Sequence, residues 1–328
     1  MSIRVLVVAP AWVGDMVMAH SLVRILVEEQ GASVDLLAPP ATAPLGARMA
    51  GVTATHELDV RHGELGLGKR RRWGVAHRGQ YDHAIVLPNS FKSALAPYWA
   101  RISQRTGWQG ESRFGVLNDR RRLDAEAYPL MVQRFVALAH PPTASVERVP
   151  LPRLAADPDN RQALCERLGL DSSVPTVVVC PGAEYGPAKR WPAEHFAEVA
   201  QHVLAEGRQV WLAGSAGDAS VAEEIAAAAP GVVNLCGRTS LVDAVDLLSL
   251  ASSVVCNDSG LMHVAGALRR SVIAIFGSTS PSFTPPLGES AVVVREPQPC
   301  SPCFERECPL GHLRCLRELS PAKVIEAL

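Results

Sequence analysis

The sequence predicts an α/β protein made of two Rossmann-like domains that face each other across a cleft. Short, β-branched apolar runs of strand length alternate with amphipathic segments of helical length, a pattern typical of a parallel sheet covered on both faces. This alternation stops near the middle of the 328-residue chain and then starts again. The length is sufficient for two domains of ordinary size.

The pause in the alternation sets the predicted domain boundary. It runs from "HPPTASVERVPLPRLAADPDN" through "LDSSVP", a polar stretch rich in proline. We therefore expect a first domain over residues 1–155, a linker over 156–172, a second domain over 173–320 and a C-terminal helix over 321–328. Ligands of such domains bind where the carboxyl ends of the strands meet the following loops.

The individual elements follow from apolar runs bounded by turn residues and from helical periodicity. In the first half we expect strands at residues 3–9, 34–38 and 83–88, and helices at 15–29, 91–101 and 129–139. In the second half we expect strands at 176–180, 209–214, 253–257 and 272–277, and helices at 193–206, 219–229, 241–251 and 261–268.

Composition narrows the class of protein. Hydrophobic residues make up 48% and charged residues 20%, and the net charge of −1 gives no reason to expect a nucleic-acid partner. No apolar run reaches the ~18 residues of a membrane-spanning helix. The N-terminus has no basic leader, and Pro10 interrupts its apolar run, which argues against a signal peptide. We expect a cytoplasmic protein.

The eight cysteines fit a reducing compartment better than a disulfide scaffold. Four are scattered through apolar stretches and are expected to be buried packing residues: Cys165, Cys180, Cys236 and Cys256.

The other four cysteines lie in "CSPCFERECPLGHLRC", which also holds His312; they are Cys300, Cys303, Cys308 and Cys315. A C-x₂-C pair followed by further Cys and His is metal-ligand spacing in principle. The remaining spacing is irregular for a zinc ribbon or an iron–sulfur cluster. A structural metal and free thiols are therefore both left open.

Four loops at strand ends carry candidate functional residues. In "PAWVGDMVMAH", Asp15 sits at a strand-to-helix junction beside a glycine. In "PGAEYGPAKRWP", Gly182 shapes a loop that places Lys189 and Arg190 at a sheet edge. The second loop predicts an anion clamp for a phosphate, with a solvated basic loop as the alternative.

The other two loops belong to the second half. "LAGSAGDASVAEEIA" offers small residues, Gly214 and Ser215, and a carboxylate, Asp218, that would bind a ribose or cap the next helix. "VVCNDSGLMHVAGA" places Asp258, Ser259, Gly260 and His263 at a helix start. Its N–H groups suit a pyrophosphate. The alternative is a capping Asp or Ser with a core histidine.

Three motifs are set aside. "GELGLGKR" resembles a P-loop, but Arg70 replaces the hydroxyl residue that would hold Mg²⁺. "DPD" at 157–159 resembles a metal-binding D-x-D but follows no apolar strand. No G-x-G-x-x-G follows either domain's first strand, which argues against a dinucleotide oxidoreductase.

Two basic runs, "KRRRWG" at 69–74 and "RRR" at 120–122, lie in the first half. They are expected to be solvated surface loops, or else contacts for a polyanionic acceptor or an anionic membrane surface.

Five motifs together resemble the ADP-heptose:lipopolysaccharide heptosyltransferases, and lie closest to members that act at the second heptose transfer. They are "WVGDMVMAHSL", "LPNSFKSALAPYWA", "PGAEYGPAKRWP", "NDSGLMHVAGAL" and "GSTSPSFTPPL", which span residues 12–287 in order. The resemblance implies a GT-B fold that binds the acceptor at the first domain and the nucleotide sugar at the second. It also implies a C-terminal helix that packs back toward the first domain.

The resemblance assigns roles to the candidates. It implies that Asp15 is the general base of an inverting transfer and that Lys189 binds the donor phosphates. Asp258, Ser259, Gly260 and His263 would surround the diphosphate and the sugar. Asn89, Ser90 and Lys92 would face the acceptor. The acidic ribose ligand of the family is not matched, so Asp218 is taken as its substitute, and the cysteine-rich segment has no role in the family pattern.

The expected donor is ADP-L-glycero-D-manno-heptose, and the expected acceptor is a heptose-containing lipopolysaccharide inner core. The protein would work in the cytoplasm or peripherally on the cytoplasmic face of the inner membrane. No cofactor would be required, because a lysine and a helix N-terminus can stabilise departing ADP without a metal.

Three alternatives stay open. Another GT-B nucleotide-sugar enzyme, acting at a different heptosyltransferase step or as an epimerase, would share the second half. A non-catalytic nucleotide-sugar binding protein would tolerate loss of Asp15 in its ligand binding. A metal-dependent interaction module would require metal on the terminal cysteines.

Overall fold

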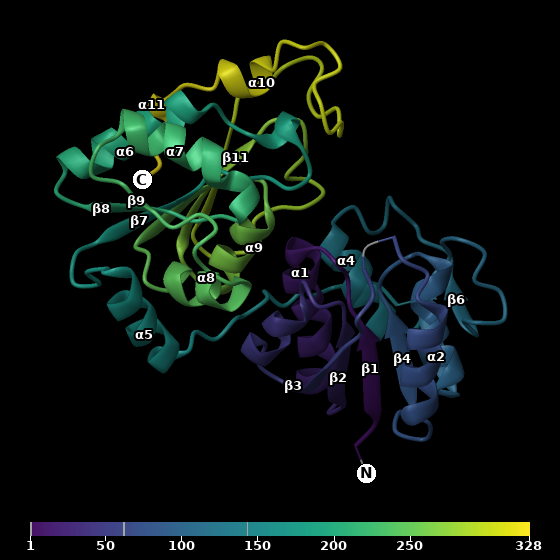
Figure 1. Ribbon diagram of the computed structural model, residues 1–328. Helices are drawn as coiled ribbons and strands as arrows, with labels where there is room; N and C mark the ends of the chain where they lie inside the picture. Colours follow the sequence, from purple (N-terminus) through teal and green to yellow (C-terminus); the bar gives the residue numbers. More distant parts are fainter. Residues whose placement is uncertain (1, 62, 143) are drawn as a thin grey trace. The chain divides into compact units, whose positions relative to one another are not determined.

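The computed structural model describes residues 2–61, 63–142 and 144–328. The chain divides into two compact units, Met1–Arg153 and Leu154–Leu328, each with its own parallel sheet (Figure 1).

The sheet of the first unit has the strand order β3-β2-β1-β4-β5-β6, and every neighbouring pair is parallel. Its strands are β1 (Arg4–Val8), β2 (Ser33–Ala38), β3 (Val52–Glu57), β4 (His83–Val86), β5 (Gln104–Trp108) and β6 (Asp119–Arg121). Its α-helices are α1 (Val13–Arg24), α2 (Leu67–Ala76), α3 (Leu95–Trp99) and α4 (Met131–Val136). Shorter helical turns are η1 (Ile25–Glu29), η2 (Ala43–Arg48), η3 (Phe91–Ala94) and η4 (Ala137–Ala139).

The sheet of the second unit has the order β12-β11-β10-β7-β8-β9 and is also parallel. Its strands are β7 (Thr176–Cys180), β8 (Gln209–Leu212), β9 (Val233–Asn234), β10 (Ser253–Asn257), β11 (Ser271–Phe276) and β12 (Ala291–Arg295). Its helices and turns are α5 (Pro158–Leu168), η5 (Pro187–Lys189), α6 (Ala193–Ala205), η6 (Ala216–Asp218), α7 (Ala219–Ala228), α8 (Leu241–Leu248), α9 (Gly260–Ala267), α10 (Arg314–Arg317) and α11 (Pro321–Ile325).

Both units therefore have the Rossmann topology that the alternation predicts. In each, the chain builds the sheet outward from its first strand in one direction and then in the other, so β1 and β4, or β7 and β10, are central neighbours. The gap above two such strands is the switch point, where ligands of open α/β sheets bind.

Burial explains why the central strands form. All residues of β7 and β10 are buried, as expected for strands covered on both faces by helices. In Figure 1, α6, α7 and α11 lie on one side of this sheet and α8 and α9 on the other, with α5 packed on α8. The core between the sheet and the first set of helices includes Trp191 and Phe196, which are essentially inaccessible.

The C-terminal segment was expected to be a helix over 321–328 that packs toward the first domain. Helix α11 forms within it, packs on α6, and buries Val324 in the core of the second unit. Its apolar side chains therefore complete the second unit's own core. Packing toward the first unit stays a prediction.

The stretch expected as a linker also contains a helix. Asp157 caps α5 by accepting hydrogen bonds from the backbone N–H groups of Asp159 (3.0 Å) and Asn160 (3.3 Å). Gly169 ends the helix in the left-handed conformation. The "DPD" motif is thus a helix start, and α5 packs on α8 within the second unit.

Across the described ranges, none of the helices is both long and apolar enough to cross a membrane.

Candidate active site

The predicted site residues lie at the two switch points. In the first unit, Asp15 is in the first turn of α1, which follows β1, and Lys92 is in η3, which follows β4. In the second unit, Lys189 is in η5, which follows β7, and Asp258 lies between β10 and α9. Topology alone therefore brings residues from distant parts of the sequence to the same sheet edge.

The centre of the second unit's site is an ion pair. The Lys189 Nζ lies 2.6 Å from the Asp258 Oδ2, and the two side chains are only 14% and 5% exposed. Thr279, which follows β11, donates its hydroxyl to the same Oδ2 at 2.6 Å. Three loops are thus joined at one carboxylate oxygen.

Asn257 is a second organising residue that the sequence did not single out. It is fully buried; its Oδ1 accepts the backbone N–H of Trp191 at 3.1 Å, and its Nδ2 donates to the carbonyl of Pro181 at 2.7 Å. One amide therefore holds both ends of the lysine loop, residues 181–191. Within this loop, the exposed Arg190 turns its Nε toward the Ala183 carbonyl (3.4 Å).

His263, in α9, is 4% exposed, and its Nδ1 has no hydrogen-bond partner among the described residues. Burial lowers the pKa of this imidazole to about 4, with a smaller opposing effect from the Asp258 charge. The ring is therefore neutral at pH 7, able to donate or accept one hydrogen bond without adding charge to the site.

Helix α9 begins at Gly260, and Ser259 is its N-cap residue, with no hydrogen bond from its side chain to the helix start. The first-turn N–H groups of a helix are not used by the helix itself and favour an anion. The structure therefore places an anion-binding helix start directly after Asp258.

Asp218 is buried, and its carboxylate bonds to a residue three positions earlier in the chain. Its Oδ2 accepts hydrogen bonds from the backbone N–H (2.9 Å) and the hydroxyl (2.8 Å) of Ser215. Gly182 and Gly214 leave room for this carboxylate, because a Cβ on Gly182 would lie 2.3 Å from the Asp218 Cγ. These contacts close the η6 turn. Asp218 is the N-cap residue of α7, but its side chain makes no hydrogen bond to the start of that helix, so the expected capping bond is absent. Contact with a ribose stays a prediction.

In the first unit, a buried arginine fixes the loop after β4 by hydrogen bonds. Arg113 is fully buried and donates to the Pro88 carbonyl (2.8 Å) and, more weakly, to the Asn89 Oδ1 (3.4 Å). Burial lowers its pKa to about 10, so it still carries its charge at pH 7. No sequence motif pointed to Arg113. Lys92 is partly exposed and is followed by Ser93, whose hydroxyl donates to the Ser90 carbonyl at 2.6 Å.

The first basic run is not the solvated loop that was expected, because residues 69–74 lie in α2. Arg70 is 6% exposed and donates its Nε to the Leu65 carbonyl (2.8 Å). Lys69 pairs with Asp59 at 3.0 Å. Of the four consecutive cations, only Arg71 and Arg72 are exposed; Lys69 is partly buried.

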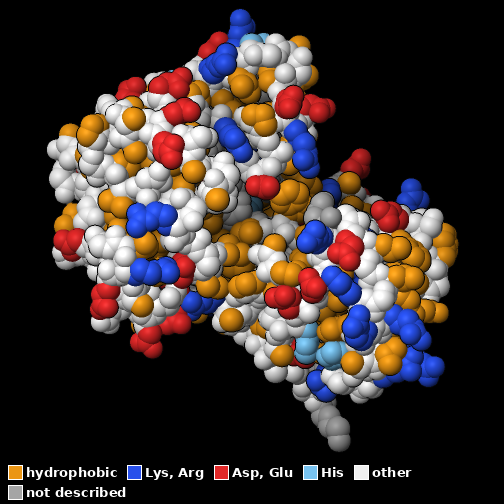
Figure 2. All heavy atoms as spheres, in the orientation of Figure 1, with side chains coloured by type: hydrophobic (Ala, Val, Ile, Leu, Met, Phe, Trp, Pro, Cys, Tyr) orange, Lys and Arg blue, Asp and Glu red, His pale blue; other side chains and the backbone are white. Residues whose placement is uncertain are grey.

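In the second basic run, residues 120–122, two of the three arginines make contacts within the first unit. The Arg121 guanidinium binds the Asp119 carboxylate at 2.7 Å, and Arg120 stacks 3.5 Å from the ring centre of Phe114, which is 70% exposed. Arg122 is exposed. In Figure 2, Lys and Arg side chains lie beside apolar ones on the surface near α2.

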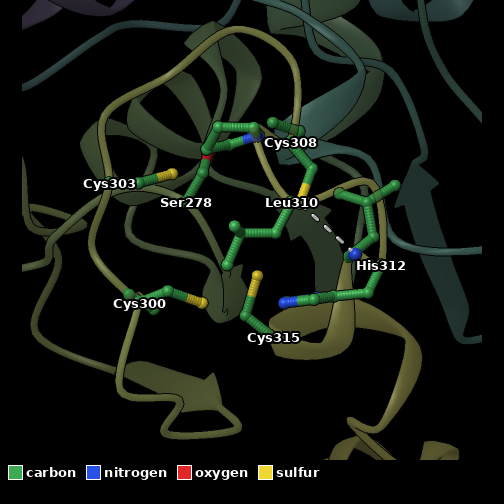
Figure 3. A pocket seen from close by; sticks show the side chains of 11 residues that line it. Ser278, Cys300, Cys303, Cys308, Leu310, His312 and Cys315 are labelled. Carbon is green, nitrogen blue, oxygen red and sulfur yellow. Dashed lines mark hydrogen bonds between the residues drawn. The ribbon is translucent and has the colours of Figure 1, made fainter.

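The four C-terminal cysteines line one pocket with His312 (Figure 3). All are free thiols. Backbone N–H groups, chiefly that of Leu313 (3.5 Å from Sγ), lower the pKa of Cys308, whereas burial raises the pKa of Cys315. In the part of the chain that the structure describes, no three His, Cys, Asp or Glu side chains are positioned to hold a metal ion. The four thiols share a pocket, and a structural metal bound to them stays a prediction.

Two Rossmann-type units, with polar groups at both switch points and a helix start in the second whose N–H groups favour an anion, fit a nucleotide-sugar glycosyltransferase of the GT-B class. The model of glycosyltransferase family 9 (heptosyltransferase) matches residues 71–314. The chain belongs to this family.

Individual relatives match nearly the whole chain. Lipopolysaccharide heptosyltransferase 2 of Escherichia coli is 44% identical over 99% of this chain and 97% of its own length. Lipooligosaccharide heptosyltransferase 2 of Haemophilus influenzae is 44% identical over 89% of this chain and 88% of its own. The solved structure of E. coli ADP-heptose LPS heptosyltransferase II has a TM-score of 0.88 and 41% identity, and covers 99% of this chain and 97% of that chain.

Proposed function

We propose that this chain transfers heptose from ADP-L-glycero-D-manno-heptose to a heptose-containing lipopolysaccharide inner core, with inversion at the anomeric carbon. The observation that carries the proposal is the lysine–aspartate pair at the second switch point, directly before the N-terminus of α9. The near-complete match to heptosyltransferase 2 proteins supports the choice of sugar and acceptor.

The proposed reaction is a single displacement. The acceptor hydroxyl oxygen forms a bond to the anomeric carbon of the heptose as Asp15 takes its proton. The bond from that carbon to the β-phosphate oxygen breaks, and its electron pair leaves with ADP. Lys189 and the N-terminus of α9 stabilise the negative charge that grows on the diphosphate.

The direct test is incubation of the purified chain with ADP-heptose and a heptose-containing inner-core acceptor, followed by measurement of ADP release and acceptor mass. We expect ADP release only when the acceptor is present. A changed sugar configuration without transfer would identify an epimerase, and tight binding without turnover would identify a non-catalytic binding protein.

We expect full activity in excess EDTA, because Lys189 and the start of α9 supply the positive potential that a metal would otherwise give. The measurement is the initial rate with EDTA, compared with the rate in added Mg²⁺. A loss that Mg²⁺ reverses would contradict this expectation. A loss that only zinc reverses would assign a metal to the cysteine-lined pocket.

We also propose that the protein binds the anionic inner membrane surface peripherally, through exposed arginines of the first unit. Replacing Arg71 and Arg72 with glutamine should raise the acceptor KM at low ionic strength only, since exposed charges act through screened, long-range attraction.

Lys92→Ala should raise the acceptor KM at every ionic strength, because Lys92 would contact the acceptor directly.

Acceptor kinetics on vesicle-embedded substrate, measured over a range of sodium chloride concentrations, separate the two effects. The matched control replaces Arg314 and Arg317, two exposed arginines of α10, with glutamine. If the Arg71 and Arg72 double variant behaves like this control, these arginines are merely solvated.

A further inference from the structure

The positive charge of Lys189 is already balanced in this structure. Its Nζ and the Asp258 carboxylate are 2.6 Å apart and largely shielded from water. The pair as a whole carries no net charge, whereas a nucleoside diphosphate sugar carries two negative charges at its phosphates. A site for such a ligand gains from a further cation near this pair.

The ring of Tyr185 contacts a second cation as well as Lys189. The Lys189 Nζ lies 4.8 Å from the centre of the ring, and the Arg306 guanidinium carbon lies 5.3 Å from it. Both distances are within the range of cation–π contact. Lys189 and Arg306 thus share one aromatic partner, although they lie 117 positions apart in the sequence and no local pattern predicts the contact.

The backbone of Arg306 is bonded directly to the lysine loop. Its carbonyl accepts the N–H of Ala188 at 3.0 Å. Gly186 makes this approach feasible, because a Cβ at that position would lie 2.4 Å from the same carbonyl oxygen. The Tyr185 hydroxyl also donates to the neighbouring Phe304 carbonyl.

The segment that carries Arg306 is fixed to the loop after β11 as well. The Phe304 N–H donates to the Ser278 carbonyl (2.8 Å), and the Ser301 hydroxyl donates to the Gly277 carbonyl (2.6 Å). The next residue along that loop is Thr279, which bonds to Asp258. The cysteine-rich segment therefore contacts two of the loops that meet at Asp258, and it holds an exposed arginine beside them.

We propose that Arg306 is a binding residue for the diphosphate of the donor nucleotide, acting beside Lys189. This inference rests on the proposed function and extends it to a segment for which the sequence analysis found no role. Arg306 suits the task because its planar guanidinium can stack on Tyr185 and still present N–H donors to phosphate oxygens.

The test measures the affinity of the full chain for ADP by calorimetry over a range of sodium chloride concentrations. Arg306→Gln should weaken ADP binding about tenfold at low salt, the usual scale for one charge-assisted hydrogen bond. The difference from the unaltered chain should narrow as salt rises, because one fewer cation meets the ligand.

Two further variants separate charge from architecture. Arg306→Lys should keep most of the affinity, since it retains the charge while losing the planar stacking group. Arg317→Gln, an exposed arginine on α10, is the matched control and should bind ADP like the unaltered chain.

Unchanged ADP affinity in Arg306→Gln would overturn the proposal. So would a loss that is equal at all salt concentrations and is not rescued by lysine, because that result identifies a residue that only shapes the loop. Failure of the unaltered chain itself to bind ADP would instead overturn the proposed function, and the inference with it.

Discussion

Replacing Asp15 with asparagine is expected to lower kcat about 10²–10⁴-fold, the usual contribution of a well-placed general base. Asparagine has nearly the same shape but cannot take the proton from the acceptor hydroxyl. Binding of ADP should not change, because the residues assigned to the nucleotide belong to the second unit. The measurements are steady-state transfer kinetics and ADP affinity of the same preparation.

The matched control is Asp59→Asn, a change at an exposed carboxylate of the first unit, 79% exposed at its side chain. It removes a surface ion pair, which typically contributes under ~1 kcal/mol to stability. Near-normal turnover in Asp15→Asn, together with normal turnover in the control, would exclude Asp15 as the base.

Replacing Lys189 with methionine is expected to cause two separate losses. The first is catalytic: kcat falls strongly and ADP binds more weakly, since the charge on the β-phosphate grows as the bond breaks. The second is structural, because the Asp258 carboxylate is left 5% exposed without its ion-pair partner. Breaking a buried pair in this way costs about 3–5 kcal/mol in the free energy of unfolding.

A double variant separates these losses. Adding Asp258→Asn to Lys189→Met removes the uncompensated charge, and the amide oxygen can still accept the Thr279 hydroxyl. Thermal or denaturant unfolding should show most of the lost stability restored, while transfer and ADP affinity stay low. Recovery of turnover in the double variant would show that Lys189 acts only by neutralising Asp258.

The central strands could be predicted closely from sequence, and the peripheral elements could not. Strands β7 and β10 match their predicted bounds because each has an apolar centre and all five of its residues are buried. The edge strands β6 and β9 have only three and two residues, too few for a periodic pattern. Helix α2 was hidden by its basic run, although Arg70 lies on its buried side.

The candidate site also has a part that could be predicted from sequence and a part that could not. A candidate at a strand end, such as Lys189, can be predicted because topology fixes where strand ends go. The ion pair that it forms with Asp258, another predicted candidate, cannot be predicted, because the two residues are far apart in sequence and the pairing depends on loop geometry. Asn257, Thr279 and Arg113 were missed for this reason: each acts through long-range hydrogen bonds that leave no local sequence signal.

The clamp formed by Asn257 makes the lysine loop a replaceable module. Because one buried amide binds the chain where the loop leaves β7 and again where it reaches Trp191, the intervening residues can change in length and composition without disturbing the sheet. The same two boundaries are natural junctions for grafting the corresponding loop of a related enzyme into this chain.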